Sequence, residues 1–221
     1  MTRSELIFLV WSDLDRLHKN PRFTHLVREL LTGQGFRYLF WFRMSQYLAS
    51  KAGWSFPLRL LTTIIRHHYS YKFGIELGLT TRVGPGLKIE HYGTIFVNGR
   101  SHIGMRCTIC QGVTLGEYGG APTVGDFCFI GPGAKAIGPV TIGNNAIIGA
   151  NCVVTKDVTE NAVMGGIPGK EISLAGNLRR ERRSEAAELR ECYRIRCPKA
   201  CLGNYGLTDQ PADSEAETYR G

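Results

Sequence analysis

An aliphatic residue recurs every six positions between Val83 and Val154, and this period constrains the fold more than any other feature of the chain. Two steps are longer, and they predict loops that leave the repeat and return to it in register. The series is Val83, Ile89, Ile95, Ile103, Ile109, Leu115, Val124, Ile130, Ala136, Ile142, Ile148 and Val154. Neither an α-helix nor an alternating strand has this period. A hexapeptide repeat predicts a parallel β-helix, whose coils bury their apolar side chains by stacking on each other.

Two further positions of the repeat carry small residues. Gly often follows the aliphatic residue, and we expect it to bend the chain with a positive φ. Four residues after the aliphatic position, Cys is found three times, and we interpret these Cys as small core residues. The Cys interpreted in this way are Cys107, Cys128 and Cys152, together with Cys110. Three more, Cys192, Cys197 and Cys201, have no His nearby, so we interpret them as free thiols rather than zinc ligands.

The chain divides into four regions. Residues 1–72 are predicted to be helical, with a break at Pro21 and a new helix that starts at Pro57. Residues 73–170 form the predicted β-helix. Residues 171–202 are predicted to form a basic helical tail, and the polar, acidic residues 203–221 are expected to be disordered. The aromatic stretch 36–48 has two interpretations: it packs against helices or a second subunit, or it lies on a membrane surface.

The formal net charge of +8 suits nucleic acid, an anionic membrane surface or a phosphorylated cofactor as a partner. No nucleic-acid-binding motif accompanies this charge, so nucleic acid is not expected. No apolar run reaches the roughly 18 residues that span a bilayer. The first residues lack the apolar core and cleavage site of a signal peptide. We therefore expect a cytoplasmic location, with contact to the inner face of the membrane through 36–48 as an open alternative.

Only two of the six His lie within the repeat, His91 and His102. His91 lies two positions after the core residue Ile89, near the turn of its hexapeptide. A single His is more often structural than catalytic, so spacing alone makes His91 a weak candidate. A zinc-dependent β-helix carbonic anhydrase is disfavoured, because it needs three His ligands and the coils offer two.

Residues 73–170 resemble the hexapeptide acyltransferases, and most closely their serine O-acetyltransferase branch. The resemblance is carried by Lys88-Ile-Glu-His91, Gln111-Gly-Val-Thr-Leu-Gly116, Ile130-Gly-Pro-Gly-Ala-Lys135, Ile142-Gly-Asn-Asn-Ala-Ile-Ile-Gly-Ala-Asn151 and Gly165-Gly-Ile-Pro-Gly-Lys170. It implies a left-handed parallel β-helix that assembles as a homotrimer or a dimer of trimers, with active sites between subunits. It also implies acetyl-CoA as a co-substrate and no metal.

The same resemblance implies roles for individual residues. His91 would be the general base that takes the proton of an acceptor hydroxyl, with Glu76, where the branch has Asp, as its orienting acid. Glu90 would contact the acceptor. The positions that match the cofactor groove are Gly116, Pro132 and Ala150 along the pantetheine arm, and Lys135, Lys156 and Lys170 as candidates for the CoA phosphates.

One loop departs from the serine-specific enzymes, which carry an Arg-His pair there to hold the carboxylate of the amino acid. In this chain the loop is Glu117-Tyr-Gly-Gly-Ala-Pro122, without Arg or His. A carboxylate without a cationic partner binds poorly. The leading prediction is therefore an O-acetyltransferase that acts on a sugar or polysaccharide precursor. The alternatives are a serine O-acetyltransferase, a drug-modifying acetyltransferase and a non-catalytic β-helix scaffold.

Overall fold

The computed structural model describes residues 1–18, 20–51, 56–174 and 176. The chain divides into two compact units, residues 1–177 and 178–221, and the description concerns the first. Four helices precede the strands: α1 (Arg3–Asp15), α2 (Phe23–Thr32), α3 (Gln34–Ala49) and α4 (Phe56–Phe73). The strands are β1 (Ile75–Leu77), β2 (Arg82–Val83), β3 (Lys88–Ile89), β4 (Ile95–Val97), β5 (His102–Ile103), β6 (Thr108–Ile109), β7 (Thr114–Gly116), β8 (Thr123–Val124), β9 (Phe129–Ile130), β10 (Lys135–Ile137), β11 (Thr141–Ile142), β12 (Ile147–Ile148), β13 (Val153–Val154), β14 (Val163–Gly165) and β15 (Lys170–Ser173).

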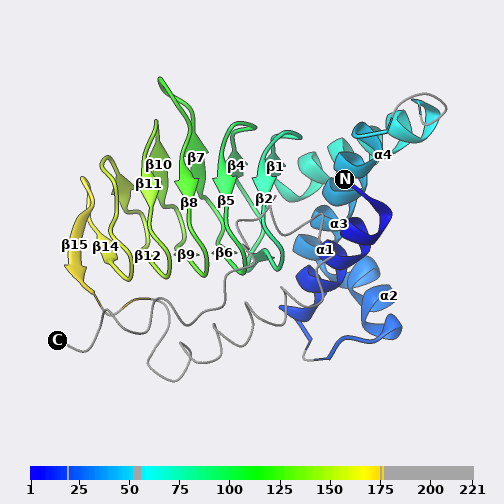
Figure 1. Cartoon of the computed structure of the whole chain (residues 1–221), viewed down its shortest axis with the longest axis horizontal. Coiled ribbons are helices and arrows are strands. Elements are labelled where there is room, and N and C mark those ends of the chain that lie inside the picture. Colours follow the sequence, from blue (N-terminus) through cyan, green and yellow to red (C-terminus); the bar gives the residue numbers. More distant parts are fainter. Residues whose placement is uncertain (19, 52–55, 175, 177–221) are drawn as a thin grey trace. The chain divides into compact units, whose positions relative to one another are not determined.

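The strands wind into stacked coils with three faces, each of which is one sheet (Figure 1). The five-stranded sheet has the order β1-β4-β7-β10-β13, the four-stranded sheet β11-β8-β5-β2, and the six-stranded sheet β15-β14-β12-β9-β6-β3. Every strand from β1 to β14 pairs in parallel with the equivalent strand of a neighbouring coil. Ile89, for example, pairs with Ile109, which pairs with Ile130. The predicted parallel β-helix is confirmed.

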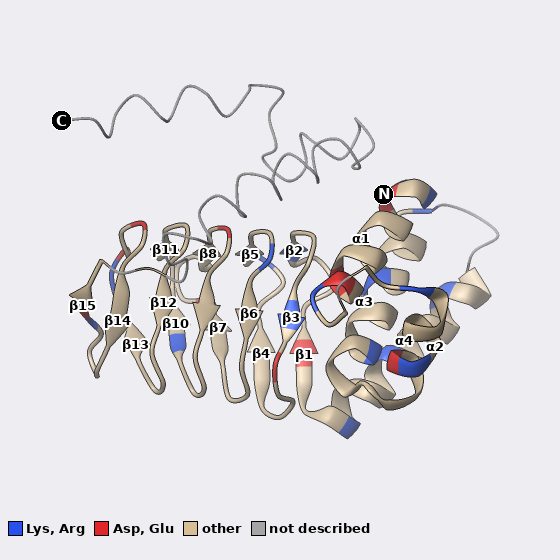
Figure 2. Ribbon diagram, turned by 90° about the horizontal axis from the view of Figure 1, so that it is seen from below, with Lys and Arg blue, Asp and Glu red and all other residues tan. Residues whose placement is uncertain are grey.

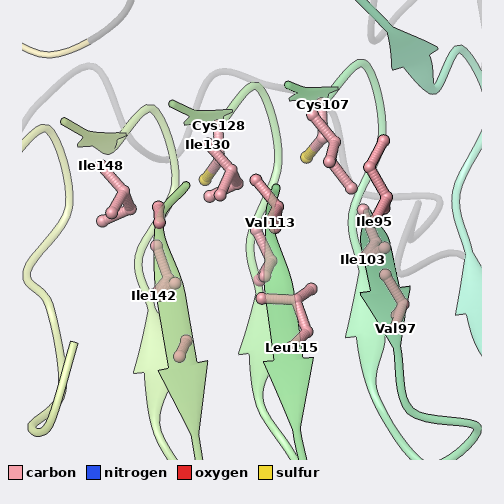
Figure 3. Close-up of a cluster of buried hydrophobic side chains, with 14 of the residues drawn as sticks. Ile95, Val97, Ile103, Cys107, Val113, Leu115, Cys128, Ile130, Ile142 and Ile148 are labelled. Carbon is pink, nitrogen blue, oxygen red and sulfur yellow. The ribbon is translucent and has the colours of Figure 1, made fainter. Parts of the chain in front are cut away.

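All twelve aliphatic residues of the six-residue series are buried, and they belong to one hydrophobic core. Figure 3 shows several of them pointing into the interior from successive coils. Cys107, Cys128 and Cys152 are fully buried beside this core, and Cys110 is buried as well. All four are free thiols, as interpreted from the sequence. The other three Cys lie outside the described residues.

The preference for Gly directly after the aliphatic residue has a different physical cause from the one expected from the sequence. None of these Gly adopts a positive φ. Instead, all of them except Gly116 lie against the backbone of the next coil: a Cβ on Gly143 would be 2.6 Å from the Glu160 nitrogen, and one on Gly131 would be 2.7 Å from the Ile148 oxygen. The prediction of turn glycines was wrong here, because the spacing between coils rather than backbone rotation excludes the side chain.

The two long steps of the repeat leave the β-helix at the same corner. Residues 98–101 connect β4 to β5, and residues 117–122 connect β7 to β8. Both connections run from the five-stranded to the four-stranded sheet. The register resumes after each of them, since Ile103 pairs with Val124 and Leu115 with Ala136. The predicted in-register loops are confirmed.

Helix α3 covers the beginning of the coils. Its side chains Tyr38, Leu39 and Phe42 are buried and belong to the same core as the first strands. Of the two interpretations of the aromatic stretch 36–48, packing is therefore the one the structure shows. Membrane contact through the partly exposed residues of this stretch stays a prediction.

A buried ion pair connects the helices to the first coil. The Arg43 guanidinium donates to both carboxylate oxygens of Asp13, at 3.0 and 3.2 Å. It also donates to the carbonyl oxygens of Val83 (2.6 Å) and Gly84 (2.7 Å), and Asp13 accepts from the Leu87 backbone N–H at 3.0 Å. Both side chains are 1% exposed. α1, α3 and the first coil are thereby held together through one charge pair.

The end of the β-helix differs from the predicted start of a helical tail. Residues 170–173 form β15, which pairs antiparallel with the open edge of β14 and becomes the last strand of the six-stranded sheet. An edge strand has backbone N–H and C=O groups without partners, and pairing with a further strand satisfies them. The rest of the predicted tail and the predicted disordered segment lie outside the described residues. Among the described helices, none is long and apolar enough to span a bilayer.

Candidate functional site

His91 lies at the corner where the chain turns from the six-stranded into the five-stranded sheet. The core residues before this corner, Ile89, Ile109, Ile130 and Ile148, are in register from coil to coil. Residues two positions later therefore form one row along the corner, about 4.8 Å apart per coil. The row is His91, Gln111, Pro132 and Ala150, which we call the corner row. Three of these four, all except Gln111, are site residues predicted from the sequence.

Glu76 lies on β1, whose start packs against the turn that carries His91. The Gly74 oxygen accepts from the Ile95 N–H at 2.9 Å. Gly74 has a φ of +62°, and a Cβ there would be 3.0 Å from the Thr94 nitrogen. The side chains of Glu76 and His91 are both exposed, and no hydrogen bond joins them in the part of the chain that the structure describes. The predicted pairing of acid and base thus stays a prediction.

Tyr38 supports the strand that carries Glu76. Its hydroxyl oxygen accepts from the Leu77 N–H at 2.8 Å, and its ring is fully buried. Burial raises the pKa of the Tyr38 hydroxyl, although the Leu77 N–H and the Arg66 guanidinium oppose this shift, and the nearby Glu76 carboxylate adds to it. The hydroxyl therefore stays protonated. Sequence reasoning did not select Tyr38, because a Tyr in an aromatic helix gives no signal of a contact 39 positions away.

Glu90 forms an ion pair with Lys88, with 2.6 Å between Nζ and Oε2. Both side chains are partly exposed, and they lie directly before His91. On the next coil, Cys110 lies close enough for their charges to act on it. Burial raises the pKa of the Cys110 thiol and Glu90 adds to the effect, while Lys88 opposes it. A protonated thiol is a poor nucleophile, so Cys110 does not suit covalent catalysis.

Gln111 is the second residue that sequence reasoning did not assign. Its Oε1 atom is buried and has no hydrogen-bond partner among the described residues. An acceptor left open beside Pro132 fits an amide N–H of a pantetheine arm that lies along the corner row. Lys135 reaches the same corner, because its Nζ donates to the Gly112 oxygen at 2.6 Å. These contacts fit CoA as the ligand of this corner.

The other predicted CoA residues are more dispersed. Gly116 ends β7 at the far edge of the five-stranded sheet, and a Cβ there would be 3.3 Å from the Ile137 side chain. Lys156 is exposed in the turn after β13, at that same far edge. Lys170 starts β15 and is aligned with Gly165. Within one chain, Gly116 and Lys156 are thus not brought to the corner row.

The loop 117–122 also leaves the far edge of the five-stranded sheet. It contains the exposed Tyr118, and Glu117 forms an ion pair with Arg100 at 2.5 Å. The width of the sheet separates this loop from His91, so the loop can join the His91 corner only from a neighbouring chain. In the described ranges, no group of three or more His, Cys, Asp or Glu is arranged to hold a metal ion.

Comparisons with known families and proteins agree with this geometry. The family described as bacterial transferase hexapeptide (six repeats) matches residues 121–156. The Helicobacter pylori serine acetyltransferase is 31% identical over 162 residues, which are 71% of this chain and 92% of that protein. The Mycobacterium tuberculosis serine acetyltransferase is 36% identical over 124 residues, 54% of each chain. The chain spans 54% to 65% of the length of the first three relatives that it matches.

Solved structures extend the likeness to the fold. A serine acetyltransferase in complex with CoA matches 77% of this chain and 71% of its own, with 29% identity and a TM-score of 0.65. The sequence predicted a mostly β fold, with a left-handed parallel β-helix after a helical N-terminal part. This match and the described strands confirm that fold class.

Proposed function

Because the chain belongs to the serine acetyltransferase family, we propose that it transfers an acetyl group from acetyl-CoA to a hydroxyl oxygen, with L-serine as the acceptor. The relatives support serine over the sugar acceptor that the sequence suggested first. The observation that carries the proposal is the corner row, in which an exposed His91 precedes three residues that fit a CoA arm. No nucleophilic side chain is required, because the acetyl group passes directly between the two substrates.

His91 acts in this proposal as the general base. Its imidazole takes the proton of the serine hydroxyl while the oxygen attacks the carbonyl carbon of the thioester. The new C–O bond replaces the C–S bond, and the proton held on His91 passes to the leaving sulfur of CoA. Acetyl-CoA supplies the activated acetyl group. Glu76 orients the imidazole, and Tyr38 supports the strand that carries Glu76.

The corner row holds the pantetheine arm in this arrangement. Pro132 and Ala150 leave the backbone accessible, and the open Gln111 oxygen accepts from an amide of the arm. Lys135 stands at the same corner and can pair with a phosphate. Lys156 and Lys170 would reach phosphates from the later coils or from a neighbouring chain.

The pair of Lys88 and Glu90 offers a way to bind serine without the usual cations. Serine is a zwitterion, and its ammonium group suits Glu90 while its carboxylate suits Lys88. The amino acid would open the 2.6 Å ion pair and replace one interaction by two. Lys88 thereby supplies the positive charge that loop 117–122 lacks. Substitution of Lys88 by Met should raise the KM for serine by about tenfold and leave the KM for acetyl-CoA unchanged.

A sugar hydroxyl is the second candidate acceptor, and one observation favours it. Loop 117–122 carries no Lys, Arg or His, and its exposed Tyr118 offers an aromatic surface of the kind on which a sugar ring can stack. The relatives do not support this reading, so it ranks below serine.

The test measures CoA release with L-serine and with a panel of hexoses, N-acetylhexosamines and nucleotide sugars. We expect turnover with serine, and a loss of about 10² to 10⁴ in kcat/KM for His91→Ala. The matched control is His102→Gln, which changes the other His of the coils and should keep nearly full activity. Full activity of His91→Ala would contradict the mechanism, and turnover of a sugar alone would contradict the acceptor. Absence of acetyl-CoA binding would favour the alternative that the chain is a non-catalytic β-helix scaffold.

A further inference from the structure

Helix α4 buries mainly polar residues and exposes its apolar side, the reverse of the usual arrangement. Its buried residues are Thr62, Arg66 and Phe73, so two of the three are polar. Most of the large apolar side chains on the rest of the helix are more than half exposed, although Ile65 and Tyr69 are partly buried. The exposed ones are Phe56 (69%), Leu58 (53%), Leu60 (52%), Leu61 (53%), Ile64 (56%) and Tyr71 (86%). A helix that packs only on its own protein places its apolar stripe toward the core, so α4 presents this stripe to something else.

The rotation of α4 about its axis is fixed by specific contacts. The Ser45 hydroxyl donates to the Thr62 oxygen at 3.3 Å, and the Ser70 hydroxyl donates to the Ile75 oxygen at 2.7 Å. The rings of Tyr69 and Phe73 stack with their centroids 5.4 Å apart, and the Arg37 guanidinium lies over both of them. The helix cannot turn its apolar stripe inward without losing these contacts. The exposed face is therefore a fixed feature of the fold.

Four of the exposed residues lie on one outer face. Leu60, Leu61, Ile64 and Tyr71 follow spacings of three, four and seven along the helix, which bring side chains onto the same side. With Phe56 at the start of the helix, they make up what we call the α4 outer face. In Figure 1 the first turns of α4 extend beyond the other helices, away from the coils. This position leaves the α4 outer face accessible to a broad, flat partner.

The charge around this face indicates what the partner is. α4 contains Arg59, Arg66 and Lys72, two His and no acidic residue. Residues 1–73 hold eleven Lys and Arg against four Asp and Glu, so +7 of the net charge of +8 belongs to the helical region. In Figure 2 the basic segments lie mainly on the helices, whereas the coils are mostly uncharged. A second copy of the chain would bring the same positive charges to the contact, but an anionic lipid surface complements them.

We propose that the α4 outer face binds the surface of an anionic lipid bilayer. The apolar side chains of Leu60, Leu61 and Ile64 enter the boundary between headgroups and acyl chains. The exposed Lys72 follows Leu61 by eleven positions, which places it at the border of the same face, where it pairs with lipid phosphates. The helix lies in the plane of the surface and does not span it, in agreement with the absence of a spanning helix among those described. This inference does not depend on the acceptor of the acetyl group.

The test is flotation of the full chain with vesicles of phosphatidylcholine alone, or with about one third phosphatidylglycerol added. We expect binding to the anionic vesicles only, with a decrease of at least about tenfold at high salt. Leu61→Gln with Ile64→Gln should reduce binding by about tenfold or more, and so should the charge reversal Lys72→Glu. The matched controls lie on the coils: Ile172→Gln, at a residue 71% exposed, and Arg82→Glu, at another exposed residue. Both should bind as the original chain does.

Each other outcome overturns the proposal. No flotation of the original chain would exclude the lipid surface. Equal binding to both kinds of vesicle would exclude the role of charge. Binding that survives both the apolar and the charge substitutions would locate the lipid contact elsewhere in the chain. A change of oligomeric mass in the Leu61→Gln, Ile64→Gln variant, without lipid binding in the original, would show that this face contacts a second copy. Turnover of serine in solution is measured separately, so a failed flotation leaves the proposed function standing.

Discussion

At the scale of single residues, the most restrictive positions of this fold are the Gly that face a neighbouring coil. Adjacent coils lie about 4.8 Å apart, which leaves no room for a side chain that points along the stacking axis. Gly143 is an example: its Cβ would be 2.6 Å from the Glu160 nitrogen and 2.9 Å from the Glu160 Cα. Backbone atoms of the next coil cannot move aside without a change in the spacing of the coils.

Gly143→Ala should therefore destabilise the β-helix by about 1 to 3 kcal/mol, as overpacking does in other cores. Urea denaturation followed by circular dichroism measures this change. Gly99→Ala is the control, because its Cβ would meet the Thr80 hydroxyl, a side-chain atom that can rotate away. Equal stability of Gly143→Ala and the original chain would mean that the coils separate more easily than the geometry implies.

Protonation of His102 should make stability depend on pH. Burial and the neighbouring Arg82 lower the pKa of His102 below the ordinary value of 6.5, while Asp126 acts in the opposite direction. The folded chain thus binds this proton less tightly than the unfolded chain. The contribution of His102 to stability is fully present above pH 6.5 and is lost as pH falls through the lowered pKa.

The free energy of unfolding should accordingly fall between about pH 7.5 and pH 5, and it should fall less in His102→Gln. Denaturation curves of both proteins at the two pH values test this expectation. An identical pH dependence in the two proteins would assign the effect to other groups.

At the scale of elements, α3 determines how the helical region is attached to the coils. Its apolar residues cover the first coil, and Arg43 adds four hydrogen bonds to Asp13, Val83 and Gly84. Burial raises the pKa of Asp13, although the Arg43 guanidinium opposes this effect. The direction of the shift indicates that burial of the Asp13 carboxylate is costly, and that Arg43 offsets part of this cost.

Arg43→Met should destabilise the chain by about 3 to 5 kcal/mol, because it leaves the Asp13 carboxylate buried without its cation. Addition of Asp13→Asn to this variant should restore part of the loss, since Asn still accepts from the Leu87 N–H and carries no charge. Thermal and urea denaturation of the two single variants and the double variant form a complete cycle. Strictly additive losses would contradict the coupling.

At the scale of the whole assembly, the outward face of the five-stranded sheet is the expected contact between subunits. It carries Ile137 (50% exposed) and Phe96 (39% exposed), next to Glu76 and Lys135 in the same sheet. Within one chain, the width of the sheet separates loop 117–122 and Lys156 from the His91 corner. A homotrimer, as the resemblance implies, would therefore complete the site.

Sedimentation or light scattering should give three times the chain mass of 24.5 kDa. Ile137→Asp should shift the chain toward the monomer and lower activity in proportion, because it places a charge on a desolvated contact. Ile172→Asp, at an exposed position of β15, is the control and should leave the mass unchanged. A fully active monomer would show that one chain contains the whole site.

Much of the fold follows from local spacing. The six-residue period placed twelve aliphatic residues in the core and located both loops, because each hexapeptide repeats the same strand and turn. The period also aligned His91, Pro132 and Ala150, since residues at equal positions of successive coils must stack. The roles of these residues came from resemblance and remain predictions, and the preferred sugar acceptor did not receive support from the relatives.

The sequence by itself thus determined the coil, its core and the row on which a CoA arm can lie, because these depend on a short period that the chain carries along its length. Only the tertiary structure showed why the Gly are needed, that Tyr38 and Arg43 reach strands about 40 positions away, and that α4 faces outward with its apolar side. These features depend on the approach of segments that are distant in the chain. Such an approach has no periodic signature, since it is set by packing in three dimensions.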